Sequence, residues 1–158
     1  MQSSTYAIAL GSNRCGRHGG PVAEVRAAIA ALDGVVATSP IIGSAPLGPS
    51  IRRFANAAVL LESALTPPQM LARLKAIERA FGRRRGARWG ARVIALDIVL
   101  WSGGSWGTAA LAVPHIAFRE RGFVLDPLRT IAPDWRDPIT GLRVRQLHAR
   151  LHKRAPLG

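Results

Sequence analysis

Hydrophobic positions along the chain follow two periods, one typical of strands and one typical of helices. Short apolar or β-branched runs predict strands at Thr5–Leu10, Val35–Thr38, Phe54–Glu62 and Val93–Trp101. Apolar residues three or four apart predict helices that begin at Pro21, at Thr66 and at Leu142. This β-α-β-β-α-β order with a mixed tail predicts an α+β fold, a ferredoxin-like split β-α-β-β-α-β sandwich with extra C-terminal helices.

The helix after Thr66 has the clearest local sequence pattern. Thr66-Pro67-Pro68-Gln69 combines an N-cap, prolines in the first turn and a glutamine at the capping-box position. Gly82 stands where a left-handed C-cap is favoured. The apolar stripe between them consists of Met70, Leu74, Ile77 and Phe81.

Alternation in the strand Val93–Trp101 assigns its residues to two faces. One face is expected to hold Ile94, Leu96, Ile98 and Leu100, and the other Ala95, Asp97, Val99 and Trp101. Asp97 is the only acid between Glu78 and Glu120, and an unpaired carboxylate is costly to bury. Two interpretations stay open for it, an ion pair with a nearby arginine or a ligand for Mg²⁺. Glu78, near the end of its helix, is by default a surface residue.

Composition limits the classes of protein that fit. The 158 residues are 48% hydrophobic and 20% charged, which supports one domain over residues 1–158 and excludes a disordered chain. The net charge is +13, and Lys75 and Lys153 are the only lysines. Arginine binds phosphate and carboxylate as a planar fork, so an anionic partner is expected. Charge alone does not separate a nucleic acid from a nucleotide.

The single cysteine, Cys15, excludes an intramolecular disulfide and a cysteine zinc site. The first ten residues lack a basic stretch, and no apolar run approaches the roughly 18 residues that span a bilayer. A cytoplasmic protein with no membrane partner is therefore expected.

Arginines cluster after Gly82. Arg83, Arg84, Arg85, Arg88 and Arg92 surround Trp89. Such a loop can be a solvated surface, can close over a polyphosphate during phosphoryl transfer, or can bind a nucleic-acid backbone. The glycine spacing Gly11-x4-Gly16 resembles a phosphate loop, but Arg17-His18 stands where Lys-Ser/Thr is required, so that interpretation fails.

Aromatic and amide side chains could hold a flat heterocycle. Aromatic faces stack on such a ring, and an amide offers a donor and an acceptor. The candidates are Phe54, Asn56, Trp89 and Phe123, although Phe54 and Phe123 are also compatible with the core. His115, after Pro114, could contact phosphate.

Taken together, these segments resemble the 6-hydroxymethyl-7,8-dihydropterin pyrophosphokinase family over nearly the whole chain. The matching motifs are Tyr6–Asn13, Pro46–Pro49, Phe54–Ala57, Ile77-Glu78, Gly82-Arg83-x-Arg85, Arg88–Arg92, Leu96–Ile98, Val113–His115, Arg121–Leu125 and Ile131–Pro133. Each motif alone is weak, and their common order makes the resemblance specific.

The resemblance implies an enzyme that passes the pyrophosphoryl group of ATP to the hydroxymethyl oxygen of the pterin, with Mg²⁺ as cofactor. It implies catalytic roles for Arg83, Arg92 and Asp97, with Asp97 also the metal ligand. It implies ATP contacts from Glu78, Arg85, Arg88, Trp89, Ile98, His115, Arg119 and Arg121. It implies pterin contacts from Ser44, Leu47, Phe54, Asn56 and Phe123. A monomer without nucleic acid is expected.

The chain departs from the family pattern at the metal strand. The family has Asp-x-Asp, where this chain has Ala95-Leu96-Asp97. Alanine has no metal-ligating atom, so the second ion is expected to be weakened or lost and the rate reduced. A degenerate paralogue that binds nucleotide or pterin without efficient turnover is the first alternative. An RNA-binding module is the second, because ferredoxin-like sheets also stack RNA bases on strand aromatics.

Overall fold

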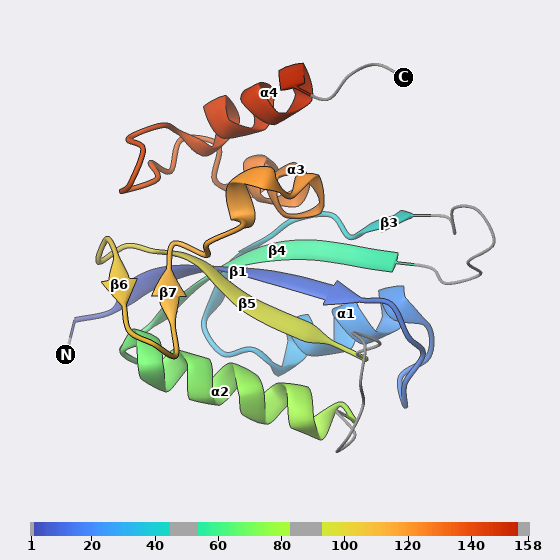
Figure 1. Ribbon diagram of the computed structural model, residues 1–158. Helices are drawn as coiled ribbons and strands as arrows, with labels where there is room; N and C mark the ends of the chain where they lie inside the picture. The colour runs from blue at the N-terminus through green and yellow to red at the C-terminus, as the bar shows by residue number, and fades with distance from the viewer. Residues whose placement is uncertain (1, 45–53, 83–92, 155–158) are drawn as a thin grey trace.

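The computed structural model describes residues 2–44, 54–82 and 93–154 (Figure 1). The strands are β1 (Ser4–Ser12), β2 (Val35–Thr38), β3 (Ile42–Ser44), β4 (Phe54–Ser63), β5 (Ala95–Trp101), β6 (Trp106–Gly107) and β7 (Ala112–Val113). The helices are α1 (Pro21–Ala31), α2 (Pro67–Ala80), the short 3-10 turn η1 (Phe118–Glu120), α3 (Gly122–Ile131) and α4 (Val144–Arg154).

The main sheet confirms the ferredoxin-like topology. Its strand order is β2-β4-β1-β5, with β3 also paired to β4. Every pairing along this path is antiparallel. The two crossings through α1 and α2 place β1 in the interior of the sheet and β5 at its edge, as the split β-α-β-β-α-β order requires.

Helices cover both faces of the sheet, because side chains of successive strand residues point to opposite sides. Figure 1 shows α1 and α2 against one face and α3 with α4 against the other. The α1/α2 side buries large residues, including Tyr6, Ile8, Leu10, Val25 and Leu74. The α3/α4 side buries smaller strand residues under larger helix residues, including Ala7, Ala9, Ala58, Leu125, Leu128 and Leu147.

The layer formed by α3 and α4 bears on the RNA-binding alternative. An RNA-binding module of this topology needs an open sheet face on which bases can stack. Here α3 and α4 cover that face along much of its length. The end where β1 finishes and β4 and β5 begin is one of the parts left exposed.

The local patterns around α2 are confirmed. The Thr66 hydroxyl accepts a hydrogen bond from the Gln69 N–H, and the Gln69 side-chain oxygen accepts one from the Thr66 N–H. This reciprocal pair satisfies two N–H groups that the helix itself leaves open. Gly82 has φ +106°, the left-handed conformation expected after the helix.

The predicted alternation in β5 is wrong at one end. It holds from Ile94 to Ile98, but the register with β1 shifts between Ala7 and Ile8, so Val99 is an extra residue in β5. Beyond this bulge, Leu100 packs on the α3/α4 side and Trp101 on the α1/α2 side.

Five elements were missed by the sequence patterns. Strand β3 is too short to show a period, and β6 and β7 form a two-stranded hairpin in the tail. The η1 turn has only three residues. Helix α3 has Pro127 inside it, which argues against a helix in a sequence because proline lacks the N–H.

Candidate functional site

Three strands place polar groups side by side at the open end of the sheet. In the paired register, Asn56 of β4 lies opposite Gly11 of β1, which lies opposite Ala95 of β5. Two residues further along β5, Asp97 lies opposite Ala9. Since side chains two apart share a face, Asn56, Ala95 and Asp97 all face the α3 side.

A cleft of about 140 Å³ occupies this position, where the start of α3 meets the sheet. It is lined by Ala9, Leu10, Gly11, Asn56, Ala95, Asp97, Arg121, Phe123 and Val124. The cleft thus combines a carboxylate from β5, an amide from β4, and a guanidinium and an aromatic ring from the start of α3. Four residues of the expected site, Asn56, Asp97, Arg121 and Phe123, are brought together here.

Gly11 leaves the space that the Asn56 amide occupies. A Cβ on Gly11 would lie 3.0 Å from the Asn56 Oδ1, which is closer than ordinary van der Waals contact. The backbone of Gly11 is ordinary strand, so glycine is favoured here by space rather than by conformation. The predicted strand ended at Leu10, before Gly11, and no pattern in the sequence indicated the role of Gly11 in the cleft.

The carboxylate of Asp97 is exposed, and no described residue forms an ion pair with it. The alternative interpretation, a structural ion pair with an arginine of the described segments, is not what the fold shows.

His115 adjoins this charged surface. Its N–H donates to the Val99 carbonyl oxygen at 3.0 Å, which fixes it beside β5. Burial lowers the pKa of His115, the Asp97 charge raises it, and the Arg121 charge lowers it, with a net pKa below the usual 6.5. The Nδ1 atom accepts a hydrogen bond from the Ala117 N–H at 3.1 Å, so in the neutral ring the proton lies on Nε2. His115 is therefore a neutral hydrogen-bond donor near pH 7.

Two phenylalanines at this end of the sheet are exposed. Phe54 is 42% exposed at the start of β4, and Phe123 is 49% exposed in the first turn of α3. Phe54 lies two residues before Asn56 and so shares its strand face. The Arg121 guanidinium lies 5.6 Å from the centre of the Phe123 ring, within cation–π range. Large aromatic side chains left in water in this way are available to stack on a planar ligand.

Two residues expected to contact ATP have side chains on the α1/α2 side of the sheet, and their contact with ATP stays a prediction. The Ile98 side chain is buried in the core on the α1/α2 side, opposite to Asp97. Glu78 is 5% exposed, and its Oε2 accepts a hydrogen bond from the Leu96 N–H at 2.8 Å. The default of a surface position for Glu78 is therefore wrong. Its geometry supports a role in positioning β5, because the Leu96 N–H that it binds lies between Ala95 and Asp97.

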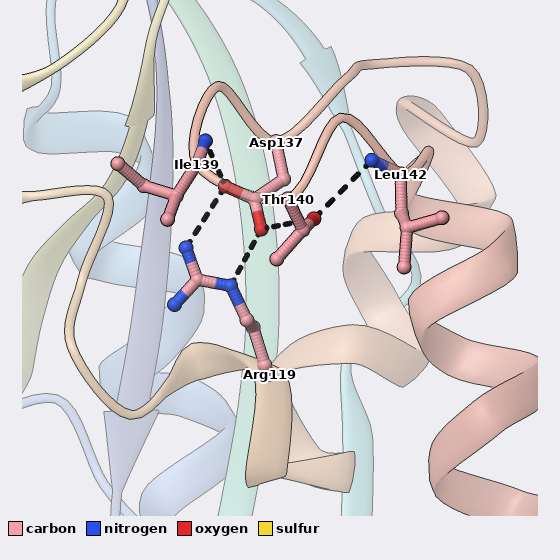
Figure 2. A network of polar contacts seen from close by, with 5 residues as sticks. All are labelled: Arg119, Asp137, Ile139, Thr140 and Leu142. Carbon is pink, nitrogen blue, oxygen red and sulfur yellow. Dashed lines mark hydrogen bonds and ion pairs between the residues drawn. The ribbon is translucent and has the colours of Figure 1, made fainter.

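Arg119 makes a buried ion pair (Figure 2). Its Nε and Nη2 donate to the two carboxylate oxygens of Asp137 at 2.5 and 2.8 Å. Asp137 is fully buried and also accepts hydrogen bonds from the Thr140 hydroxyl and the Ile139 N–H. This network ties η1 to the loop before α4. It uses two nitrogens of the guanidinium, so contact between Arg119 and ATP stays a prediction.

Of the remaining expected residues, only Ser44 lies in the part of the chain that the structure describes. Ser44 ends β3 opposite Phe54, at the same end of the sheet as the cleft. Leu47, Arg83, Arg85, Arg88, Trp89 and Arg92 lie outside the described residues. Their contacts with pterin or ATP stay predictions.

The cleft offers oxygen ligands of the kind that Mg²⁺ binds. This ion prefers oxygen ligands and is often held by one or two carboxylates together with substrate phosphates and water. Asp97 supplies one such carboxylate, and Asn56 offers an amide oxygen in the same cleft. Ala95 lines the cleft where a second carboxylate would stand. The cleft therefore fits one protein-held Mg²⁺.

The fold and this cleft together define a ferredoxin-like α+β protein with a small polar site at one end of its sheet. The model of the family 7,8-dihydro-6-hydroxymethylpterin-pyrophosphokinase matches residues 7–133. The chain belongs to this family.

Curated relatives support the membership. The chain is similar to the 2-amino-4-hydroxy-6-hydroxymethyldihydropteridine pyrophosphokinase of Bacillus subtilis, with 35% identity over 97% of this chain and 92% of the relative. The protein of the same name from Pseudomonas aeruginosa is 40% identical over 83% of this chain and 82% of its own length. The one from Synechocystis is 41% identical over 66% of this chain, and the match spans only 53% of that longer protein.

Solved structures support the fold. The Plasmodium falciparum HPPK-DHPS structure with pteroate superposes with a TM-score of 0.76 over 97% of this chain and 45% of that chain, at 12% identity. At this identity the likeness shows the fold alone.

No helix in the described ranges is long and apolar enough to cross a membrane.

Proposed function

We propose that this chain transfers the pyrophosphoryl group of ATP to the hydroxymethyl oxygen of 6-hydroxymethyl-7,8-dihydropterin and releases AMP, a step of folate biosynthesis. The bond from the pterin oxygen to the β-phosphorus forms, the bond from that phosphorus to the bridging oxygen of AMP breaks, and the hydroxyl proton is released. The observation that carries this proposal is the convergence of Asn56, Asp97, Arg121 and Phe123 on one cleft in a chain of this family.

The pterin end of the cleft is formed by Asn56 and the exposed aromatic rings. The Asn56 amide can both donate to and accept from the edge of the heterocycle. Phe123 offers a ring face from α3, and Phe54 offers another from the start of β4. Stacking with such rings is worth about 0.5–1.5 kcal/mol beyond the area buried. Asn56 therefore fixes the orientation of the ring, and the phenylalanines add affinity.

The phosphate end is formed by Arg121, His115 and Asp97. The Arg121 guanidinium supplies positive charge and directional donors for phosphate oxygens. Neutral His115 offers its Nε2–H as a further donor without adding charge. Arginines at 83, 85, 88 and 92 would add to this positive charge, and their roles rest on the resemblance alone.

Asp97 would hold Mg²⁺ together with phosphate oxygens. When bound, this ion withdraws charge from the phosphoryl oxygens and favours attack at phosphorus. Ala95 leaves this chain with one carboxylate where the family pattern has two, so we propose a slower enzyme. The residues themselves orient the two substrates, and orientation alone accounts for a large part of phosphoryl-transfer catalysis.

The test is AMP release from ATP in the presence of 6-hydroxymethyl-7,8-dihydropterin, measured over a range of Mg²⁺ concentrations. The proposal expects AMP and pterin diphosphate in equal amounts, with neither formed when the pterin is left out. Asp97→Asn keeps the shape of the side chain and is expected to abolish turnover. Absence of product at every Mg²⁺ concentration would contradict the proposal.

The degenerate paralogue remains the second candidate, supported by the specific observation that Ala95 lines the cleft. It predicts ATP or pterin binding by calorimetry without AMP above background. One domain over residues 1–158, a monomer, a cytoplasmic location and the absence of a nucleic-acid partner all stay predictions.

A further inference from the structure

A cluster of metal-ligating side chains lies on the far side of the sheet from α1 and α2, between α3 and α4. Asp126 of α3 accepts a hydrogen bond from the His148 Nε2 at 2.6 Å. The His152 Nε2 lies 3.8 Å from the same carboxylate oxygen. Ligand atoms of all three residues lie within 4.8 Å of one another. We propose that Asp126, His148 and His152 form a second metal site, specific for a borderline transition-metal dication such as Zn²⁺, Ni²⁺ or Co²⁺.

The spacing of the two histidines favours chelation. His148 and His152 are four residues apart on α4, so both project from one face of the helix. Two histidines at this spacing on a helix are a recurrent pair of zinc ligands. The two imidazole rings are already in contact, with centres 4.1 Å apart.

The distances are close to those that a metal requires. With metal–ligand bonds near 2.1 Å, the ligand atoms of a tetrahedral site are about 3.4 Å apart. Two of the three separations, 2.6 and 3.8 Å, lie on either side of this value, and the third is no more than 4.8 Å. Side-chain rotations would have to close these differences when a metal binds.

The ligand set selects the class of metal. Two imidazoles and one carboxylate suit Zn²⁺, Ni²⁺, Co²⁺ or Cu²⁺, whereas Mg²⁺ prefers oxygen ligands throughout. The second site would therefore be distinct from the Mg²⁺ position at Asp97 in chemistry as well as in place. Three protein ligands leave at least one position open to water or another ligand.

The exposure of two of the three ligand side chains allows a metal to enter from solvent. The His148 side chain is 11% exposed, while those of Asp126 and His152 are 43% and 56% exposed. One ligand is thus fixed by packing, and two lie at the surface. A bound metal would take the place of the proton between His148 and Asp126, because each ligand atom needs a free lone pair.

The consequence would be a link between α4 and the functional face of the molecule. Asp126 lies three residues after Phe123, which lines the cleft at the start of α3. Both histidines lie beyond residues 7–133, the part of the chain that the family model matches. A metal at this site would therefore attach the tail helix to the helix that forms one wall of the cleft.

The experiment is calorimetric titration of the purified full chain with Zn²⁺ near pH 7.5, paired with thermal melts. We expect one Zn²⁺ per chain at this site, a higher melting temperature with Zn²⁺, and no such rise with the same concentration of Mg²⁺. Co²⁺ in place of Zn²⁺ should give visible d–d absorption bands.

The variants His152→Gln and Asp126→Asn remove exposed ligands and are expected to fold. Each should weaken Zn²⁺ binding at least tenfold and remove the Co²⁺ bands. Cys15→Ser is the control, since the exposed thiol of Cys15 is another group with affinity for these metals. Unchanged binding in both ligand variants, loss of binding in Cys15→Ser, or no binding in the parent protein would each overturn the proposal.

Discussion

Asn56 of β4 lies opposite Gly11 of β1, and the Asn56 amide occupies the space that the missing side chain of Gly11 leaves. The Asn56 Oδ1 is 3.0 Å from the position of a Cβ on Gly11. The orientation of the group proposed to read the pterin edge thus depends on a residue that makes no polar contact of its own.

Gly11→Ala is expected to displace the Asn56 amide while the fold is kept, because the backbone at residue 11 is ordinary strand. Loss of one well-placed hydrogen bond costs about 0.5–1.5 kcal/mol, so the KM for the pterin should rise about two- to tenfold. The KM for ATP should change little. Steady-state kinetics with each substrate varied in turn will measure both, and an equal rise in the two would contradict this division of the cleft.

Ala95→Asp restores a carboxylate two residues from Asp97 on the same strand face. Since metal stabilisation of phosphoryl transfer is worth several kcal/mol, kcat should rise about tenfold or more and half-saturation should need less Mg²⁺. Ala95→Asn is the matched control, because it has a similar shape without the charge. No gain with Asp, or the same gain with Asn, would show that Ala95 does not mark the missing ligand.

The pKa of His115 should respond to the charges at the cleft. The Asp97 charge raises the pKa of His115, and the Arg121 charge lowers it. Asp97→Asn is therefore expected to lower the His115 pKa further, and Arg121→Gln to raise it. Following the His115 ring by NMR across pH 4–8 gives both shifts, and an unchanged His115 pKa in both variants would separate it from the cleft.

The Arg119–Asp137 ion pair is expected to stabilise the fold. Removal of one member of a buried pair costs about 3–5 kcal/mol, so Asp137→Asn should lower the free energy of unfolding by about 3 kcal/mol. Asp134→Asn is the control, because exposed Asp134 pairs with Arg145 at the surface and should cost under about 1 kcal/mol. Denaturant titration distinguishes the two, and equal losses would contradict the account.

The same network predicts a pH dependence of stability. Burial raises the pKa of Asp137, but hydrogen bonds from Arg119, Thr140 and Ile139 lower it more, and the net pKa lies below the ordinary value. A carboxyl with a lowered folded-state pKa stabilises fully above its unfolded pKa of about 4 and loses this stabilisation as pH falls through the folded value. Asp137→Asn should therefore flatten the loss of stability below pH 4, measured by denaturant titrations at several pH values.

Local patterns were sufficient for most of the fold. The Thr66–Gln69 capping box and the glycine after α2 are determined by neighbours in sequence, and both are confirmed. The extra residue Val99 in β5 depends on pairing with β1, more than 80 residues away, so no local pattern could reveal it.

The sequence was enough to identify residues of the candidate site, but not to predict how they are arranged in space. Asp97, Asn56 and Phe123 were candidates from the residues themselves and Arg121 from the family resemblance, and the fold brings all of them together. The partner of Arg119 is Asp137, and the partners of Asp126 are His148 and His152, each brought close by packing of the tail onto α3 or η1. Such contacts depend on tertiary structure, because nothing in the intervening sequence specifies them.

The transfer of two phosphates as a unit can be followed directly with ATP labelled with ³²P at the α or the γ position. After incubation with Mg²⁺ and 6-hydroxymethyl-7,8-dihydropterin, the α label should appear in AMP and the γ label in the pterin diphosphate. Recovery of the α label in ADP, or of the γ label only in free phosphate, would contradict the account.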